Sequence, residues 1–537
     1  MPRFSVVIPT LRRADTLEHA LATVLAQPFA DVEVVVQNNG GDAATRDVVE
    51  RAGDDRVRHF QTDDVVPMTD NWELALANSA GEYVTFIGDD DGLLPDACDI
   101  AATVLESGGS RFELLMWEPF LYCWPEFYDP PRRNVLLASV AAELSVQPLD
   151  THLLLERFYA FDLHYSKLPM AYNSFVARTL IDRVRADRGR YFLGTSPDVT
   201  SGIVNAWASK DVLKLSRPLS VAGLSQHSSG HRMTMVDEAP PRDVLERDFP
   251  LLASPRSEDA LVNLELGIAA DMLLLQEMLF AGDETIVFSR QGLVQTLAAT
   301  INDNPLRYDA TKEAIDRLAE RHAIDPRLIV IPPKGARTPL PAFGTHARSP
   351  DEVLHVIDGS AAGLGTIEDA CGLAAQLLPA DRGIVWKQSR SGPPLVTTAP
   401  LSFARDGDGS DALATGWGEQ ESWGTWSVQP VGVLRLRVPE RAVEGPVRLA
   451  LRYRTLPLAG VARRVECISG GRTLHAWNFS KSNASGEVVV EVPSHLGNGL
   501  LELSLHAVDA RAPSELGLGS DTRRLGIGVE QIRLLPA

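Results

Sequence analysis

The sequence predicts an α/β protein with a doubly wound parallel sheet at its N-terminus, a helical and mixed middle region and a C-terminal antiparallel β-sandwich. In the first hundred residues, β-branched runs alternate with amphipathic helical patterns, which is typical of a parallel sheet covered by helices. From about residue 400, short segments of alternating polarity such as "VRLALRYRTL" and "GEVVVEVP" are separated by turns. That spacing indicates a β-sandwich.

Each N-terminal element has its own local signal. The run "FSVVIP" is β-branched and closed by proline, as in a buried parallel strand. The helical pattern after it places Leu17, Leu21 and Val24 on one face. The remaining elements follow in alternation: a strand that ends in turn chemistry within 32–41, a short helix at 44–52, a strand at 57–62, a helix at 68–80, a strand at 84–87 and a helix at about 95–107.

A chain of 537 residues is too long for one hydrophobic core, so several domains are expected. We predict an α/β domain over residues 1–240 and a helical region over 241–330. A proline- and glycine-rich linker with a small α/β segment is expected over 331–399, and the sandwich over 400–537.

Composition and charge narrow the class of protein. Hydrophobic residues at 45% and charged residues at 23% are typical of a globular chain, and a net charge of −20 argues against a general nucleic-acid binder. The four cysteines lack metal-like spacing, which favours free thiols. No signal peptide or spanning segment is recognised, so we expect a cytoplasmic protein, with peripheral association at the inner face of the membrane left open.

Polar residues follow three of the predicted strands at the point where each strand ends. These are Pro9-Thr10, Asn38-Asn39 and the run 89–91, which is three consecutive aspartates. The carboxyl ends of parallel strands meet at one edge of the sheet, where ligands of such folds bind. The sequence therefore predicts one binding crevice lined by all three segments.

The aspartate run 89–91 would be repulsive without a counter-charge. Mg²⁺ and Mn²⁺ take oxygen ligands, usually one or two carboxylates together with substrate phosphates. Such a cation could stabilise a departing diphosphate. The alternative is a solvated acidic turn that precedes a helix.

The motifs "SVVIPTLRRADTLEHALATVLAQ", "VVVQNNGG" and "GEYVTFIGDDDGLLP" resemble the family 2 glycosyltransferases of the GT-A fold, over roughly residues 3–235. This resemblance implies transfer of a sugar from a nucleotide diphosphate, with inversion at the anomeric carbon and with Mn²⁺ or Mg²⁺ as cofactor. It implies that Asp91 is the direct metal ligand and that Asp89 lies near both the metal and the donor. The residues implied at the donor nucleotide are Pro9, Thr10, Arg12, Asn71, Asp89 and Asp90. For Asn71 the alternative is a helix N-cap beside a core tryptophan, Trp72, which the sequence favours slightly.

The chain departs from the family at Asn38 and Asn39, where an acid usually accepts the uracil imide N–H. An asparagine carbonyl can accept that N–H while its amide donates to the neighbouring carbonyl. We therefore favour a UDP- or dTDP-linked donor, with both asparagines at the base. A tight turn is the alternative for this segment.

An inverting transfer needs a general base for the acceptor hydroxyl. The resemblance implies that this base is an aspartate about a hundred residues after the metal motif, and Asp198 in "GTSPDVTSG" fits that position. The alternative is that Asp198 only stabilises the start of a helix through the helix dipole. Glu82 and Asp162 are weaker rivals. A downstream histidine of similar enzymes suggests His227 as a further metal ligand, although a histidine in a polar loop is more often solvated. Tyr172 is expected to approach the same cleft.

The expected function is sugar transfer to a hydroxyl of a glycan or lipid-linked acceptor in bacterial surface polysaccharide synthesis. The pathway follows from resemblance alone, because the C-terminal sandwich is similar to modules found on such transferases. Trp417, Trp423, Trp426 and Trp477 are either sugar-stacking platforms or sandwich core, and we favour core. The alternative function is a catalytically silent carbohydrate-binding or assembly protein.

Overall fold

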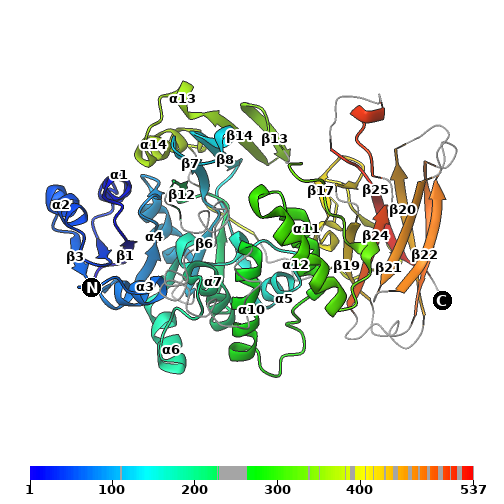
Figure 1. Cartoon of the computed structure of the whole chain (residues 1–537), viewed down its shortest axis with the longest axis horizontal. Helices are drawn as coiled ribbons and strands as arrows, with labels where there is room; N and C mark the ends of the chain where they lie inside the picture. The colour runs from blue at the N-terminus through cyan, green and yellow to red at the C-terminus, as the bar shows by residue number, and fades with distance from the viewer. Residues whose placement is uncertain are drawn as a thin grey trace.

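The computed structural model has 537 residues, and its fold is shown in Figure 1. The residues that the structure describes are 1–108, 112–226, 228, 263–336, 339–349, 351–380, 383–387, 394–405, 407–414, 416–428, 431–438, 446–456, 463–469, 472–479, 484–493, 500–507, 510–516 and 523–535.

The first sheet has nine strands in the order β15-β9-β11-β6-β10-β4-β1-β2-β3. Its strands are β1 (Phe4–Thr10), β2 (Val32–Asn38), β3 (Val57–Gln61), β4 (Tyr83–Phe86), β6 (Leu114–Trp117), β9 (Ser145–Leu149), β10 (Ser174–Ala177), β11 (Val212–Leu215) and β15 (Val385–Trp386). Strands β3, β2, β1 and β4 are parallel neighbours, which confirms the predicted sheet of the first hundred residues. Every residue of β1 and β2 is buried, because helices cover both faces.

The second sheet has the order β13-β14-β8-β7-β12-β5. Its strands are β5 (Gly92–Leu93), β7 (Phe120–Cys123), β8 (Val135–Ala141), β12 (Ser220–Leu224), β13 (Gly344–Ser349) and β14 (Glu352–Asp358). Strand β14 pairs with β8 along its whole length, and β15 pairs with β9 of the first sheet. Residues 344–386, expected in a linker and a small α/β segment, thus complete both sheets of the N-terminal part. The predicted domain boundaries themselves stay a prediction.

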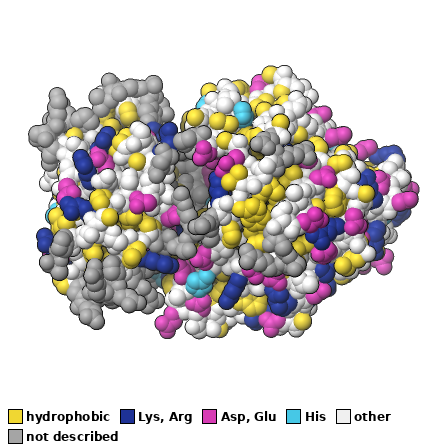
Figure 2. All heavy atoms as spheres, turned by 180° about the vertical axis from the view of Figure 1, so that it is seen from behind, with side chains coloured by type: hydrophobic (Ala, Val, Ile, Leu, Met, Phe, Trp, Pro, Cys, Tyr) yellow, Lys and Arg dark blue, Asp and Glu magenta, His cyan; other side chains and the backbone are white. Residues whose placement is uncertain are grey.

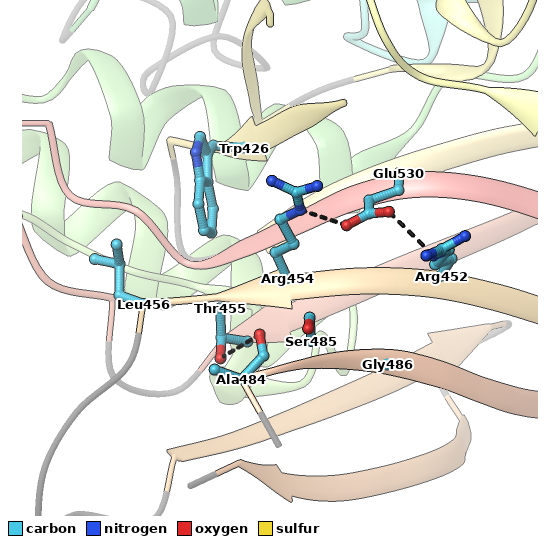
Figure 3. Close-up of a pocket in the computed structure, with 9 residues that line it drawn as sticks. All are labelled: Trp426, Arg452, Arg454, Thr455, Leu456, Ala484, Ser485, Gly486 and Glu530. Atoms are coloured by element: carbon cyan, nitrogen blue, oxygen red, sulfur yellow. Dashed lines mark hydrogen bonds and ion pairs between the residues drawn. The ribbon is translucent and has the colours of Figure 1, made fainter. Parts of the chain in front are cut away.

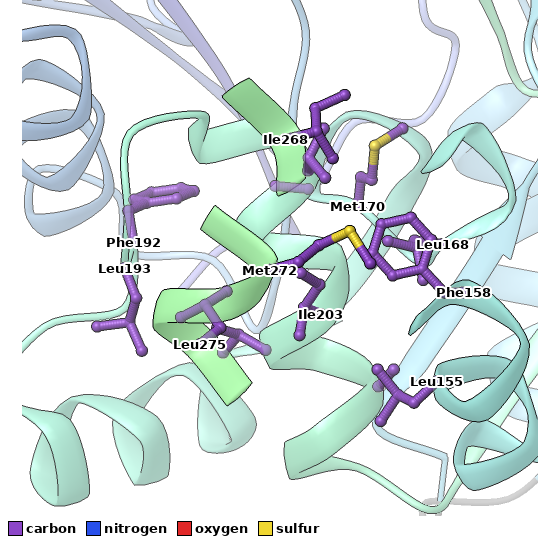
Figure 4. Close-up of a cluster of buried hydrophobic side chains, with 14 of the residues drawn as sticks. Leu155, Phe158, Leu168, Met170, Phe192, Leu193, Ile203, Ile268, Met272 and Leu275 are labelled. Atoms are coloured by element: carbon purple, nitrogen blue, oxygen red, sulfur yellow. The ribbon is translucent and has the colours of Figure 1, made fainter. Parts of the chain in front are cut away.

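Helices surround these sheets. They are α1 (Ala14–Leu25), α2 (Ala43–Ala52), α3 (Met68–Ala77), α4 (Ala97–Gly108), α5 (Thr151–Tyr159), α6 (Arg178–Arg188), α7 (Pro197–Ala208), α10 (Leu264–Leu279), α11 (Arg290–Thr300), α12 (Tyr308–Arg321), α13 (Gly359–Ala362) and α14 (Ile367–Leu377). Helix α10 packs on α7 and α5 through a hydrophobic cluster that includes Ile203, Met272 and Leu275 (Figure 4). This packing fixes the position of α7, whose first turn carries Asp198.

The C-terminal part consists of two antiparallel sheets, as predicted. One contains β16 (Leu401–Ser402), β17 (Trp417–Gln420), β18 (Thr425–Ser427), β20 (Val447–Thr455), β23 (Ser485–Val492) and β25 (Ile527–Leu534); the other contains β19 (Val431–Arg437), β21 (Arg463–Ser469), β22 (Arg472–Phe479) and β24 (Leu500–Ala507). Alternate residues of both sheets, such as Leu449, Leu451 and Leu503, share one core.

The sandwich contacts the helical region through both apolar and charged residues. Leu328 packs with Val431 and Val433 of β19. Asp162 forms an ion pair with Arg435 of β19, and both side chains are mostly buried, at 4% and 14% exposed. The two parts are therefore joined by side-chain contacts as well as by the chain.

All four cysteines are buried and free, as expected. No helix among the residues described above is long and apolar enough to cross a membrane. On the face seen in Figure 2, acidic and basic side chains are interspersed. The acidic net charge is therefore not gathered into one patch on that face.

Candidate active site

The acidic turn begins directly after β4, at the carboxyl edge of the first sheet. Asp89 is 2% exposed and accepts hydrogen bonds from Thr10 Oγ1 at 2.7 Å and from Arg13 Nη1 at 3.0 Å. Burial raises the pKa of Asp89, although Arg13 opposes that rise. The turn is thereby tied to the end of β1, as the convergence of strand ends predicts.

Asp90 points to the other side, toward the segment that follows β12. Its Oδ2 accepts hydrogen bonds from the hydroxyls of Ser225 and Ser228, each at 2.7 Å. Its backbone carbonyl accepts a hydrogen bond from Trp124 Nε1 at 3.1 Å. Gly223 of β12 lies so close that a Cβ atom there would be 1.7 Å from that carbonyl oxygen. Only glycine fits at this position.

Asp91 accepts two backbone hydrogen bonds, from Gly88 N and Gly223 N, each at 2.7 Å. Burial, followed by the charge of Asp90, raises the pKa of Asp91 to about 7, and the two N–H groups oppose that rise. The turn thus concentrates negative charge that its own protein neighbours compensate incompletely.

Asp198 lies in the first turn of α7, behind Pro197. The preceding loop is held by Asp271 of α10, whose carboxylate accepts hydrogen bonds from the backbone N–H groups of Thr195 and Ser196, each at 2.9 Å. Burial raises the pKa of Asp198, and backbone N–H groups of its helix start oppose the rise. A carboxylate with a raised pKa is a better proton acceptor than one in water.

Tyr172 connects the acidic turn with Asp198. Burial raises its pKa well above the ordinary value, and the next causes are the charges of Asp91, Asp198, Asp90 and Asp89 in that order. The neighbouring Ala171 links the same elements directly, because its carbonyl accepts a hydrogen bond from Thr85 Oγ1 of β4 and its N–H donates to Ser201 Oγ of α7. The fold therefore brings together the metal-motif aspartates and the candidate base, which are more than a hundred residues apart in sequence.

The donor set fits a hard divalent cation in its chemistry. It offers buried carboxylate oxygens with excess negative charge, which Mg²⁺ or Mn²⁺ completes with substrate phosphates. Within the described ranges, no three histidine, cysteine or acidic side chains are arranged around one point as a complete metal site. Such a site would depend on phosphate oxygens for its remaining ligands. His227 lies outside the described residues.

Asn38 and Asn39 are both buried; Asn38 is hydrogen-bonded within its own loop, and Asn39 is hydrogen-bonded to the segment between β3 and α3. Asn38 Nδ2 donates to Asp42 O at 2.8 Å, and Asn39 Oδ1 accepts from Val66 N at 2.9 Å. Their side-chain amides hold the loop after β2. A role in binding the base of the donor nucleotide stays a prediction. Asn71 is different: it is 4% exposed, and its Oδ1 has no hydrogen-bond partner among the described residues.

Pro9 and Thr10 end β1 at this edge, as expected. Arg12 is exposed in a left-handed conformation with φ of 56°, whereas its neighbour Arg13 contacts Asp89. Of the rival bases, Glu82 pairs with Arg3 just before β4, at the opposite edge of the sheet. Asp162 pairs with Arg435 of the sandwich. Neither rival lies on the acidic turn.

Comparison with known proteins identifies the class of the N-terminal region. Residues 5–128 match the family described as "Glycosyl transferase family 2". A GalNAc(5)-diNAcBac-PP-undecaprenol beta-1,3-glucosyltransferase of Campylobacter jejuni is 35% identical over 100 residues, which are 18% of this chain and 32% of that protein. An uncharacterized glycosyltransferase of Rickettsia typhi is 22% identical over 152 residues, or 28% and 45% of the two chains.

The chain spans between a third and a half of the length of these curated relatives. The match to the glycosyltransferase family model covers β2, β3, β4 and the acidic turn. Among solved structures, Staphylococcus aureus TarS 1-349 in complex with UDP-GlcNAc is 17% identical, covering 60% of this chain and 87% of that one at a TM-score of 0.33. Full TarS is 12% identical, covering 99% and 86% at 0.32. These low scores add nothing to the domain match.

Several residues of the site were not predicted from the sequence. Arg13, Gly223, Ser225, Ser228 and Asp271 all contact the turn or the helix start described above. Arg13 adjoins a predicted residue, so the arginine pair "RR" was a usable signal. The others lie more than a hundred residues from the acidic turn, and no local pattern marks them.

Proposed function

We propose that this chain is a metal-dependent, inverting glycosyltransferase that moves a sugar from a nucleotide diphosphate donor to an acceptor hydroxyl. The observation that carries this proposal is that Ala171, beside Tyr172, is hydrogen-bonded both to Thr85 of β4 and to Ser201 of α7, whose hydroxyl donates to Asp198 O. These bonds tie the strand before the acidic turn, which lies in the region that matches family 2 glycosyltransferases, to the helix start that carries Asp198. A metal-binding turn and a separate carboxylate with a raised pKa are the two groups that an inverting transfer requires.

Asp198 is proposed as the general base. It takes the proton of the acceptor hydroxyl as that oxygen attacks the anomeric carbon, and the bond from this carbon to the diphosphate oxygen breaks on the opposite face. Asp271 is a positioning residue, because it holds the loop from which α7 begins. Precise placement of the base and acceptor lowers the entropic barrier of the reaction.

Asp91, with Asp89, is proposed to hold the cation, Mn²⁺ or Mg²⁺. When bound, this ion would neutralise the negative charge that develops on the departing diphosphate. Arg13 and Thr10 hold Asp89 in place. The serines that engage Asp90 keep the turn from rotating, so its neighbours face the crevice.

We propose a UDP- or dTDP-sugar as donor, with Asn38 and Asn39 near the base. The unpartnered Oδ1 of Asn71 supports its place on the donor side, because a buried acceptor without a donor is costly. The name of the Campylobacter relative gives a lipid-linked glycan as its acceptor. That supports a glycan or lipid-linked acceptor. Surface polysaccharide synthesis at the inner face of the membrane is part of the proposal and rests on the sequence resemblance.

The experiment is a donor-hydrolysis and transfer assay with a panel of UDP-, dTDP-, GDP- and CDP-sugars, with Mn²⁺ and with EDTA. We expect nucleotide release from one donor class only with the metal, and an inverted anomeric configuration in the product by NMR. Release that is unchanged by EDTA or by Asp198→Asn would contradict the mechanism. No release with any donor would favour a silent carbohydrate-binding or assembly protein.

A further inference from the structure

The C-terminal sandwich has a groove on its outer surface that the transfer reaction does not use. The groove has a volume of about 450 Å³, within the usual range for small-ligand sites. Strands β18, β20, β23 and β25 form it, and its lining includes Trp426, Arg452, Arg454, Ser485 and Glu530 (Figure 3). These strands lie at the end of the molecule opposite β1–β3 in Figure 1.

The tryptophans of the sandwich fall into two groups. Trp417 and Trp477 pack against the sandwich core, which agrees with the core interpretation. Trp423 and Trp426 do not belong to any described core cluster; their rings meet edge to face at 5.2 Å. Both rest on Gly528 of β25, where a Cβ atom would lie 2.6 Å from the Trp423 ring. The Trp426 ring is therefore held rigidly at the groove, as a platform for another ring.

The charged groups beside this platform carry more positive than negative charge. Glu530 is the only acid among the lining residues, and it pairs with both Arg452 and Arg454. Arg454 also lies over the Trp423 ring at 4.4 Å, so its guanidinium is fixed on two sides. Each arginine uses its Nε toward Glu530, and the terminal nitrogens have no hydrogen bond to another described residue.

A ligand that fits these groups has a ring with an apolar face and a nearby acidic group. Arginine donors bind a carboxylate more strongly than a neutral hydroxyl, because charge-assisted, paired hydrogen bonds form. Ser485 is exposed and adds a hydroxyl at the rim. We propose that this groove binds a saccharide unit that carries a carboxylate, as in an acidic glycan, with its ring on Trp426 and its carboxylate at Arg452 and Arg454.

The test is calorimetric titration of the full chain, without donor or metal, with a galacturonic acid trisaccharide. We expect binding that Trp426→Ala and Arg452→Gln each weaken by about tenfold or more. Arg452 is 59% exposed, so its replacement should leave the fold intact. Arg448→Gln is the matched control, because Arg448 is an exposed arginine of the same strand outside the groove, and its affinity should equal that of the unmodified chain.

Four outcomes would overturn the proposal, three with the unmodified chain and one with the control variant. The first three are no binding of the acidic trisaccharide, equal binding of a neutral glucose trisaccharide, and full competition by inorganic phosphate, which offers no ring to Trp426. Loss of affinity in Arg448→Gln equal to that in Arg452→Gln would also contradict it, since binding would then follow net charge rather than the groove. Transfer activity does not enter this test, so its result is independent of the proposed reaction.

Discussion

The carboxylate of Asp271 holds the loop before α7 by accepting a hydrogen bond of 2.9 Å from the backbone N–H of Thr195. The same carboxylate also accepts hydrogen bonds from the backbone N–H of Ser196 and from the hydroxyl of Thr195. Asp271 is 2% exposed, in the middle of α10. Helix α10, more than seventy residues downstream, thus fixes where α7, the helix that carries the candidate base Asp198, begins.

Replacing Asp271 by alanine should lower both stability and transfer. Loss of the acceptor leaves buried N–H groups unpaired, at a cost of about 1–3 kcal/mol in the free energy of unfolding. Thermal unfolding should show a lower Tm, and kcat should fall while donor binding is kept. Asp316→Ala, at an exposed acid of α12, is the control and should change neither. Unchanged kcat in a destabilised variant would show that Asp271 does not position Asp198.

Asp198→Asn should abolish transfer and leave nucleotide binding intact, because an amide cannot accept the acceptor proton. Steady-state assays and nucleotide titrations on the same preparation separate these two effects. Since burial raises the pKa of Asp198, the unmodified enzyme should lose kcat on acidification at a pH above the ordinary aspartate value of 3.8. Turnover of the asparagine variant near the normal rate would remove Asp198 from the mechanism.

Gly223→Ala should disrupt the acidic turn from the side of β12. A Cβ atom would overlap the carbonyl of Asp90, and the backbone N–H that Asp91 accepts would have to move. Metal-dependent nucleotide binding should weaken strongly and Tm should fall. Gly372→Ala in α14, where a Cβ atom meets open space, is the matched control and should bind normally. Normal binding by Gly223→Ala would mean that the turn tolerates displacement.

The contact between the sandwich and the helical region should respond to pH when Arg435 is removed. Burial raises the pKa of Asp162 to about 7, and Arg435 limits that rise. A raised folded pKa means that the folded state holds its proton while the unfolded state ionises, so stability declines as pH rises from about 4 to about 7. Without Arg435 the folded pKa rises further, and this decline continues to higher pH.

Arg435→Ala should therefore be more destabilising at pH 8 than at pH 5, by up to about 1.4 kcal/mol, because the two proteins differ in their titration only over the one pH unit above 7. Denaturant unfolding at both pH values measures this difference. Arg437→Ala, at an exposed position of the same strand, should show little effect at either pH. A pH-independent loss for Arg435→Ala would mean that packing, not charge, dominates the contact.

The sequence was informative wherever a local pattern decided the structure. Buried β-branched runs followed by polar residues correctly placed Thr10 and the acidic turn at one sheet edge, because parallel strands leave no other arrangement. Contacts between distant segments left no such pattern. In the sequence, Asp271 is a single acid within an apolar helix, with no sign of its partners. The segment "VLHVID" likewise does not indicate that β14 pairs with β8.

The same limit explains the tryptophans. A tryptophan in a strand is equally compatible with a core and with a surface platform. In the structure, Trp417 packs against the sandwich core, whereas Trp423 and Trp426 do not. Likewise, the sequence allows the asparagine pair after β2 either to bind the nucleotide base or to stabilise the loop. In the structure Asn38 and Asn39 brace the loop, through partners that spacing alone does not reveal.

The central claim is that the acidic turn binds a nucleotide diphosphate through a divalent cation. Calorimetric titration of UDP into the full chain, with Mn²⁺ and again with EDTA, tests it most directly when run beside Asp91→Asn. We expect binding only with Mn²⁺, lost in Asp91→Asn and kept in Asp63→Asn, an exposed acid after β3. Equal binding by Asp91→Asn, or binding unaffected by EDTA, would contradict it.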